Sequence, residues 1–420
     1  MKRIFSAALC AIALFASCDP DAGIKTVSVN VEIDETKLGE ISAETYEVTF
    51  TNTTTAASTV VETENGTATA SVVPGIYTIT AKSSATADGM FYTITGSVKD
   101  LNIISEGETV KIIVDMVKES QLIFKELYYQ GSTFETGQIK DDGTPETNTY
   151  FRDQYYEIYN NSDEVAYADG LCICDTDFAS WDYSLFYEFT DADGKSYPTS
   201  DYVFGQIFWQ IGGDGDDYPI QPGESFIIAQ WATDHKAETL SNGFSPVNLT
   251  GAEFEAIEAE STLWNGIVIT DGPAHNMRIA VNAAGYAPPQ WLTPVGGCNM
   301  VLFRPSAPFR TENFLINNDP DWVQQFHEIS VADVLDAVQS IDDETRINTL
   351  GMPALLDVGY IWCNGTYNGQ SISRKEVGTL ANGSPKYQDT NNTTNDFVVN
   401  ESPVIRRGGA KVPAWNTWNK

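Results

Sequence analysis

Carboxylates grouped around a short Asp-Ala-Asp-Gly segment are the residues of this chain best suited to bind a metal ion. Asp191 and Asp193 lie two residues apart, and Asp201 follows nearby. Calcium takes several carboxylate oxygens, but an EF-hand loop also carries a Glu at its twelfth position, which this segment lacks. Asp-Gly is in addition a common pair in tight hairpin turns. We therefore expect a turn here, with calcium as the alternative and no other cofactor.

Tryptophans in aromatic-rich stretches are the candidates for stacking on a sugar or on a partner protein. Aromatic residues crowd three stretches, which are Tyr150–Tyr159, Trp181–Phe189 and Tyr202–Trp209. Alternation along a strand places about half of such side chains in a core. Of the others, we expect Trp181, Trp209 and Trp291 to be exposed and available to a ligand.

The sequence contains no familiar catalytic motif. It has no Gly-x-Ser-x-Gly elbow, phosphate-binding loop, zinc-protease motif or dinucleotide fingerprint. A glycoside hydrolase needs only two facing carboxylates, and these cannot be chosen by sequence among 58 acidic residues. We expect a protein that is not an enzyme. A secreted hydrolase acting on polysaccharide, with two acids of raised pKa in a cleft, is one alternative.

The cysteines are compatible with two interpretations. Cys172 and Cys174 lie two apart in a predicted strand, so both side chains point the same way. Either could pair with Cys298 or Cys363 in an oxidising compartment, or all could be buried thiols in a core. A zinc site would require closely spaced Cys or His residues. The three histidines are scattered: His235, His275 and His327.

The N-terminus has the features of a bacterial lipoprotein signal. Lys2 and Arg3 precede the apolar run Ile4–Ala16, which is too short for a permanent membrane span. Small residues then lead to Cys18, as in a lipobox. We expect cleavage after residue 17, lipidation of Cys18 and attachment to a membrane through that lipid. An ordinary cleaved signal with an incidental cysteine is the alternative.

Charge and the first residues of the mature chain bear on its location. The net charge of -34 disfavours nucleic acid and anionic lipid headgroups as partners. Residues 18–25 form a short acidic tether, in which Asp19 and Asp21 resemble the surface-export signals of Gram-negative gut anaerobes. In enteric bacteria, an Asp at this point instead resembles an inner-membrane retention signal. We expect anchoring in the outer membrane with exposure at the cell surface.

The first domain is predicted to cover residues 26–118 as a small β-sandwich. Valines and isoleucines alternate with polar residues in Thr26–Ile33, and Asn65-Gly66 and Pro74-Gly75 mark turns. Short strands at even intervals without helical periodicity indicate a sandwich. The string Asn65–Ala81 resembles carboxypeptidase-regulatory or transthyretin-like modules, a likeness that implies an immunoglobulin-like fold and a spacer or docking role.

The second domain is predicted to cover residues 119–420. Two stretches, Leu122–Tyr129 and Gln154–Asp177, are similar to the opening strands of lamin-tail-like domains. Tyr218–Gln230 resembles a later strand of that family. The family's closing motif is matched by Arg374, Lys375, Asp389, Asn391, Asn392, Asp396 and Phe397. The resemblance implies an immunoglobulin-like sandwich used for binding and anchoring, with an insertion around residues 242–366.

The insertion is predicted to contain a helix. Ser330 is a possible N-cap, and Val334, Leu335, Val338 and Ile341 follow at helical spacing. A second short helix is expected over 342–350. The predicted fold class is therefore mainly β, with two immunoglobulin-like β-sandwich domains and a helix-containing insertion in the second.

The whole arrangement resembles an uncharacterised family of lipoproteins from Gram-negative gut anaerobes. The resemblance supplies no catalytic residues. We expect a non-catalytic surface accessory that binds a partner protein or nutrient ligand, next to an outer-membrane transporter. A structural or adhesive envelope protein is a further alternative.

Overall fold

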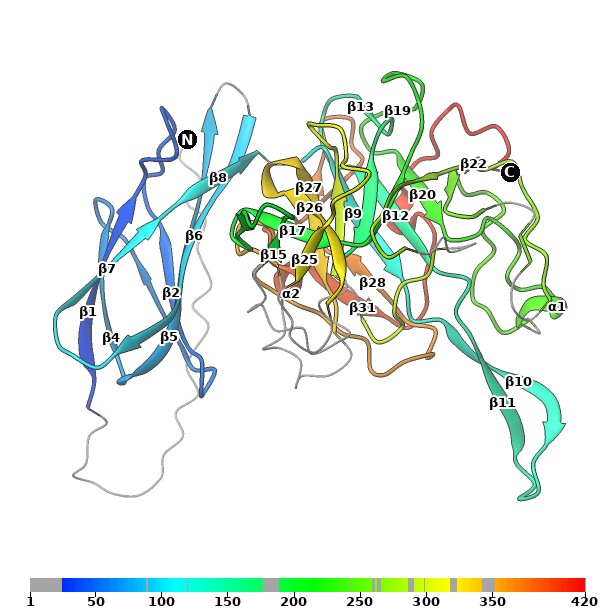
Figure 1. Cartoon of the computed structure of the whole chain (residues 1–420), viewed down its shortest axis with the longest axis horizontal. Helices are drawn as coiled ribbons and strands as arrows, with labels where there is room; N and C mark the ends of the chain where they lie inside the picture. Colours follow the sequence, from blue (N-terminus) through cyan, green and yellow to red (C-terminus); the bar gives the residue numbers. More distant parts are fainter. Residues whose placement is uncertain are drawn as a thin grey trace. The chain divides into compact units, whose positions relative to one another are not determined.

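The computed structural model describes residues 25–419, apart from 88–89, 119, 177–188, 242, 259–260, 263–265, 286–290, 298, 318–322 and 342–351. Its strands and short helical turns form two compact units (Figure 1). Unit 1 comprises the described residues up to Thr36, with Glu44–Lys82 and Ser97–Val114, and unit 2 comprises Lys37–Ala43, Ser83–Gly96 and the chain from Asp115 onward. Within the described residues, no helix is long and apolar enough to cross a membrane.

Unit 1 is built from two sheets. One has the order β4-β1-β7, with β4 Thr67–Val72, β1 Val27–Asp34 and β7 Glu108–Ile113. The other has the order β3-β2-β5-β6-β8, with β3 Ser58–Glu62, β2 Glu47–Asn52, β5 Gly75–Ala87, β6 Met90–Ile103 and β8 Asp115–Lys118, of which β8 belongs to unit 2. Alternate side chains of both sheets are fully buried, among them Val29, Phe50 and Ile79. The alternation seen in the sequence therefore marks the inner faces of a two-sheet structure.

Unit 2 is organised around a seven-stranded sheet of order β22-β21-β20-β12-β9-β28-β31. These strands are β22 His275–Asn276, β21 Phe254–Glu255, β20 Ser225–Ala229, β12 Tyr155–Asn160, β9 Leu122–Tyr128, β28 Ser371–Arg374 and β31 Phe397–Asn400. Every residue of β9, β12 and β20 is buried. The central strands of the sheet are therefore covered on both faces.

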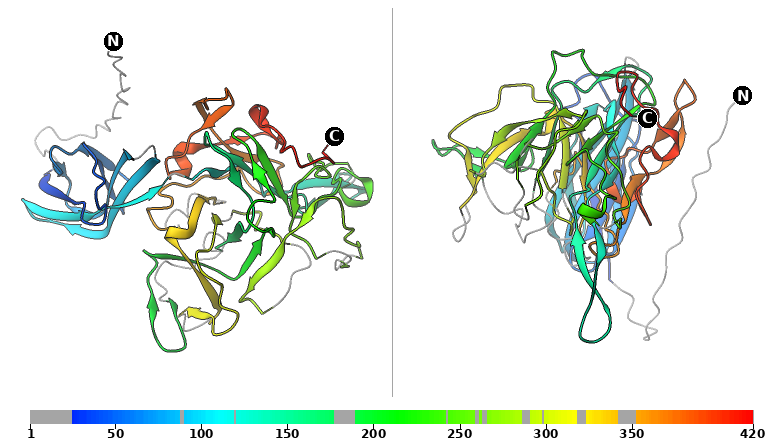
Figure 2. Two further views of the ribbon diagram at one scale, coloured as in Figure 1. Left: turned by 90° about the horizontal axis from the view of Figure 1, so that it is seen from above. Right: turned by 90° about the vertical axis from the view of Figure 1, so that its right-hand side faces the viewer.

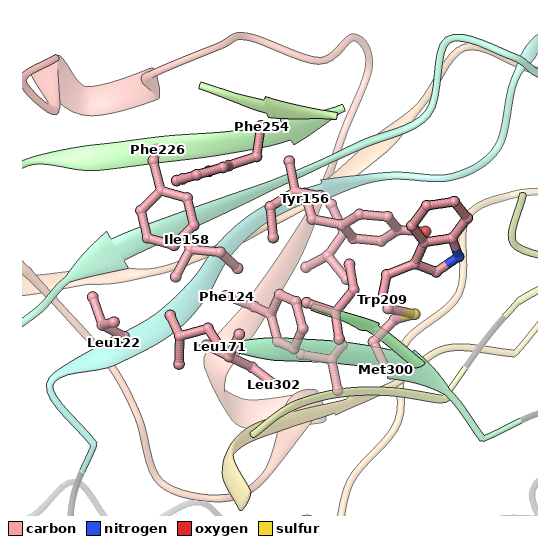
Figure 3. Packing of buried hydrophobic residues seen from close by; sticks show 14 of the residues in the cluster. Leu122, Phe124, Tyr156, Ile158, Leu171, Trp209, Phe226, Phe254, Met300 and Leu302 are labelled. Carbon is pink, nitrogen blue, oxygen red and sulfur yellow. The ribbon is translucent and has the colours of Figure 1, made fainter. Parts of the chain in front are cut away.

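A five-stranded sheet of order β23-β18-β14-β24-β27 packs against one of those faces. Its strands are β23 Arg278–Asn282, β18 Ile207–Gln210, β14 Cys172–Asp175, β24 Asn299–Phe303 and β27 Val334–Gln339. Figure 3 shows Phe124, Ile158 and Phe226 of the first sheet meeting Trp209 and Leu302 of the second. This apolar layer is the main core of unit 2.

The remaining strands and helical turns lie outside these two sheets. A third sheet has the order β16-β15-β25-β26-β17, with β16 Ser196–Tyr197, β15 Phe189–Thr190, β25 Leu315–Asn317, β26 Gln325–Ser330 and β17 Tyr202–Gly205. Small two-stranded ribbons are β10–β11 (Ser132–Ile139, Pro145–Tyr150), β13–β19 (Ala166–Tyr167, Pro219–Ile220) and β29–β30 (Glu376–Thr379, Pro385–Tyr387), and β8 (Asp115–Lys118) pairs with β6. Helical turns are α1 Glu238–Ser241, η1 Val331–Asp333, α2 Thr393–Asp396 and η3 Arg407–Gly409.

The mainly β fold class is confirmed, but the helix predicted after Ser330 is wrong. Ser330 does cap a helical turn, because its hydroxyl accepts from the Ala332 N–H, yet that turn is only η1. The apolar residues beyond it form β27, which pairs with β24. A strand buried on both faces shows a continuous apolar run that periodicity cannot distinguish from a helix. The second predicted helix, over 342–350, lies outside the described residues.

The segment 242–366 contributes directly to both sheets of the body. Its strand β21 pairs with β20, and its strand β24 pairs with β14. Both partner strands come from outside the segment. These residues are thus part of the sandwich itself within the described structure.

Candidate functional site

Two of the predicted calcium ligands, Asp191 and Asp193, lie at the hairpin turn between β15 and β16, whereas Asp201 lies between β16 and β17. The Asp191 carboxylate accepts hydrogen bonds from the backbone N–H groups of Asp193 and Lys195 at 3.0 and 2.9 Å. Hydrogen bonding from Lys195 is the main cause of the lowered pKa of Asp191. Asp201 instead accepts from the Ser200 hydroxyl. Across the described residues, no three His, Cys, Asp or Glu side chains are arranged to hold a metal ion.

The predicted exposure of two tryptophans is wrong. Trp209 is 1% exposed in β18, and Trp291 is 5% exposed. Trp291 packs on Tyr156, with ring centroids 5.3 Å apart. Both indoles belong to the main core of unit 2, because the two sheets enclose them, so neither can stack on an external ligand. Trp181 lies outside the described residues.

The cysteines in the described residues are core side chains. Cys172 and Cys363 are buried thiols outside any disulfide, and Cys174 is also buried. Burial raises the pKa of Cys172 and of Cys363 to about 12. A thiol with so high a pKa is a poor nucleophile and metal ligand near neutral pH. Cys298 lies outside the described residues.

The fold also brings together Ser, His and Asp residues that no sequence motif connects. The Ser245 hydroxyl donates to Asp153 Oδ2 at 2.6 Å, while His235 Nδ1 faces the Tyr150 hydroxyl at 2.8 Å. Burial raises the pKa of Asp153 to about 7 and lowers that of His235 to about 4. An activated serine needs a base in contact with its hydroxyl. Here the serine contacts the acid, and all four side chains are buried, so the group is a polar part of the core.

A second buried polar group surrounds Arg374. Its guanidinium donates to both carboxylate oxygens of Asp336, at 2.7 and 2.8 Å, and to Asp389 and Asp396 at 3.3 Å. Its Nε donates to the Phe124 carbonyl. The arginine and Asp336 come from β28 and β27, one from each sheet. Arg374, Asp336, Asp389 and Asp396 therefore join the two sheets. Their hydrogen bonds to one another leave no space for a substrate between them.

The outer face of the seven-stranded sheet carries buried acids under the C-terminal segment 401–419. Glu126 and Glu157 are paired across β9 and β12, and Glu157 binds Lys125 at 2.9 Å. From the segment, Arg407 Nε donates to Glu126 at 3.0 Å and the Arg406 N–H donates to Glu157 at 3.0 Å. Figure 2 (right) shows this red segment on the opposite side of unit 2 from the yellow strands. These charges hold the covering segment in place.

Four aromatic side chains gather where the C-terminal segment reaches edge strand β22. We call Tyr218, His275, Trp415 and Trp418 the aromatic platform. All four are partly exposed. Ring centroids are 5.0 Å apart for Tyr218 and His275, 5.2 Å for Tyr218 and Trp415, and 5.4 Å for His275 and Trp418. One edge of unit 2 thus presents a continuous set of rings.

The indoles of the platform are fixed in position by the backbone. Trp415 Nε1 donates to the Pro219 carbonyl and Trp418 Nε1 to the Ala252 carbonyl, each at 2.9 Å. Among the described residues, the Tyr218 hydroxyl and both ring nitrogens of His275 have no hydrogen-bond partner. Burial lowers the pKa of His275, so its imidazole is neutral near pH 7. The platform therefore combines rigid rings with polar atoms that no described residue bonds.

An acidic loop lies directly before the platform. Asp169 Oδ1 accepts from the N–H groups of Gly215 and Asp217, and its Oδ2 accepts from the N–H of Tyr218. The loop carboxylates of Asp216 and Asp217 are exposed. In the sequence, Trp415 and Trp418 stand three residues apart near the C-terminus. That Trp-x-x-Trp spacing is the one signal that could have found the platform.

Unit 2 also contains an apolar cavity of about 540 Å³. Its lining includes Leu122, Tyr167, Arg304 and Val334. Arg304 donates to the carbonyls of Asp169 and Tyr167 at 2.8 and 2.7 Å. The guanidinium of Arg304 is therefore already engaged by backbone carbonyls.

Comparison with known proteins places this architecture in a family. The crystal structure of a DUF4876 family protein from Bacteroides thetaiotaomicron VPI-5482 is 30% identical, with a TM-score of 0.58, over 93% of this chain and 99% of that one. The chain belongs to the DUF4876 family. The family model, described as a protein of unknown function, matches residues 221–404. That range holds His275 of the platform, whereas Tyr218, Trp415 and Trp418 flank it.

Other similarities of this DUF4876 protein are remote. A proposed adhesin from Bacteroides ovatus ATCC 8483 is 8% identical, with a TM-score of 0.20, over 76% of this chain and 88% of that one. The major pilin T-13 of Streptococcus pyogenes is 13% identical, with a TM-score of 0.12, over 45% and 92%. Likenesses this low carry no argument about fold or function. No curated protein matches the chain.

Proposed function

We propose that this DUF4876 protein is a non-catalytic, lipid-anchored envelope protein that presents a ligand-binding surface on unit 2. The observation that carries the proposal is the contrast between its polar groups. The Ser245, His235 and Asp153 group and the Arg374 group are buried and bonded within the fold. The aromatic platform is partly exposed and has polar atoms that no residue in the described part of the chain bonds. Binding suits this distribution better than catalysis does.

The anchor is the lipobox cysteine. Lipidation of Cys18 followed by the acidic tether 18–25 would hold the protein at the outer membrane. Unit 1, with its transthyretin-like hairpin, would act as a spacer, and unit 2, with its lamin-tail-like motifs, as the binding part. Next to an outer-membrane transporter, such a protein would hold a nutrient or contact the transporter itself.

Fractionation of cells that express the full chain tests the anchor and the location. We expect the wild-type protein in the outer-membrane fraction of Bacteroides thetaiotaomicron and its cleavage by protease added to intact cells. The Cys18→Ala variant should lose the membrane association, because it lacks the lipid-bearing thiol. Equal fractionation of both proteins, or full protection of the wild type from protease, would contradict the proposal. A mild-detergent purification then shows whether an outer-membrane barrel accompanies the protein.

A further inference from the structure

We propose that the aromatic platform is a carbohydrate-binding site for neutral hexopyranose chains, an inference that rests on the proposed binding role of unit 2. Rings from three separate parts of the chain form it: Tyr218 before β19, His275 in β22 and the tryptophans of the C-terminal segment. All four are partly exposed at one edge of the body. A sugar ring would stack on the exposed part of this set.

The rigidity of the platform favours stacking. The N–H groups of Trp415 and Trp418 are used by carbonyls of the body, so the indoles are oriented before any ligand arrives. A ligand therefore loses little affinity to the ordering of these side chains. Since the indole N–H groups are engaged, the apolar ring surfaces are what the tryptophans present.

The chemistry of the neighbouring groups fits a pyranose. A pyranose ring has an apolar C–H face and a rim of hydroxyl groups that donate and accept hydrogen bonds. The platform supplies aromatic surface for the face. The unused Tyr218 hydroxyl, the His275 nitrogens and the exposed carboxylates of Asp216 and Asp217 can bond the rim. A purely apolar ligand would leave these polar atoms without a role.

The charge around the platform and the spacing of its rings both favour a neutral sugar as the ligand. The net charge of -34 and the adjacent acidic loop repel anionic polysaccharides. A quaternary ammonium ligand needs a space enclosed by rings. Here the rings contact one another, with centroids between 5.0 Å apart for Tyr218 and His275 and 6.3 Å apart for Trp415 and Trp418, so they fill the space that an ammonium group would occupy.

Titration of the full chain tests the proposal. The protein is kept in a detergent without a sugar headgroup, and calorimetry is run with maltohexaose, cellohexaose and β-1,4-mannohexaose as probes. We expect saturable binding of at least one of them below about 10 mM. Absence of binding by all three up to that concentration would overturn the ligand class, as would stronger binding of choline or of a hexagalacturonate.

Variants locate the site. Trp418→Ala and His275→Ala should each weaken binding by about tenfold, because each removes one ring of the platform. Trp418→Phe keeps a ring and should cost about threefold or less. Tyr360→Ala is the matched control, since Tyr360 is a partly exposed ring stacked on Trp362 elsewhere in unit 2, and it should leave the affinity unchanged.

The outcomes separate folding, ligand class and function. Circular dichroism verifies that each variant is folded, and His275→Ala offers a milder change than loss of an indole if Trp418→Ala does not fold. Equal affinity of wild type and folded platform variants would overturn the site even if a sugar binds. Failure of the sugar titration leaves the anchoring result for Cys18→Ala unaffected, so the two proposals fail separately.

Discussion

Removal of the Arg374 side chain is the perturbation whose cost the structure defines best. Arg374 and Asp336 have side chains only 2% and 3% exposed and are joined by two hydrogen bonds. In Arg374→Met, the Asp336 carboxylate would remain buried, with only backbone N–H donors, and the Phe124 carbonyl would lose the Arg374 Nε donor. Breaking one partner of a buried ion pair costs about 3–5 kcal/mol. We expect that loss in the free energy of unfolding of unit 2.

Tryptophan fluorescence in urea measures this loss selectively. All nine tryptophans lie between Trp181 and Trp418, so the signal follows unit 2 and not unit 1. Lys375→Met is the matched control, because the neighbouring ammonium group contacts only an exposed carbonyl, and its effect should be about 0.5 kcal/mol or less. The double variant Arg374→Met with Asp336→Leu should recover part of the loss, since no charge is then left unpaired.

The pH dependence of Arg374→Met provides a second readout. Burial raises the pKa of Asp336 to about 7 even beside Arg374. Loss of the cation raises that pKa further, so the additional loss of stability in the variant is absent at low pH and grows as pH rises through the folded pKa. The variant should therefore be closest to the wild type near pH 4. A loss below about 1 kcal/mol at pH 8 would refute the view that this ion pair holds the two sheets together.

Three further outcomes follow from the buried and turn-forming groups. Asp153→Asn should stabilise unit 2 by roughly 2–4 kcal/mol at pH 8 and have little effect at pH 4. The reason is that a carboxyl whose folded pKa is about 7 destabilises the fold as pH rises above the pKa of the same carboxyl in the unfolded chain. Urea unfolding at both pH values measures the change in stability, and equal effects at the two pH values would contradict the prediction. Cys172 and Cys363 should resist a thiol reagent at pH 8 until urea unfolds the protein, since burial raises the pKa of both to about 12, and rapid labelling of the native protein would show that they are accessible. Addition of calcium should shift Tm by less than about 1 °C, because the Asp191 carboxylate already accepts hydrogen bonds from the backbone of its own turn. A rise in Tm of several degrees that Asp191→Ala abolishes would instead establish a calcium site.

Local patterns in the sequence predicted local structure well. The alternation of Val29 and Val31 marks the buried face of β1, and Asn65-Gly66 adopts the positive φ angles expected of a turn. The stretch Tyr218–Gln230, which was expected to contain a strand, holds β20. In each case the signal comes from neighbours in the chain, because side-chain direction and turn geometry are set over a few residues.

Properties that depend on distant segments were not accessible from the sequence. Trp209 was expected at the surface, but its exposure depends on which sheet covers β18. The apolar run of β27 was taken as a helix, because only its pairing with β24 identifies it as a strand. The platform unites Tyr218 with Trp415, which are almost 200 residues apart, and no local pattern links such positions.

The segment 401–419 has a consequence for how the protein is made. It is synthesised after every strand of the sheet that it covers, and it brings the Arg406 and Arg407 contacts to the buried carboxylates. Until it emerges, Glu126, Glu157 and Glu253 on the sheet lack these partners, which disfavours burying them. Unit 2 therefore completes its folding only when the C-terminal segment is released.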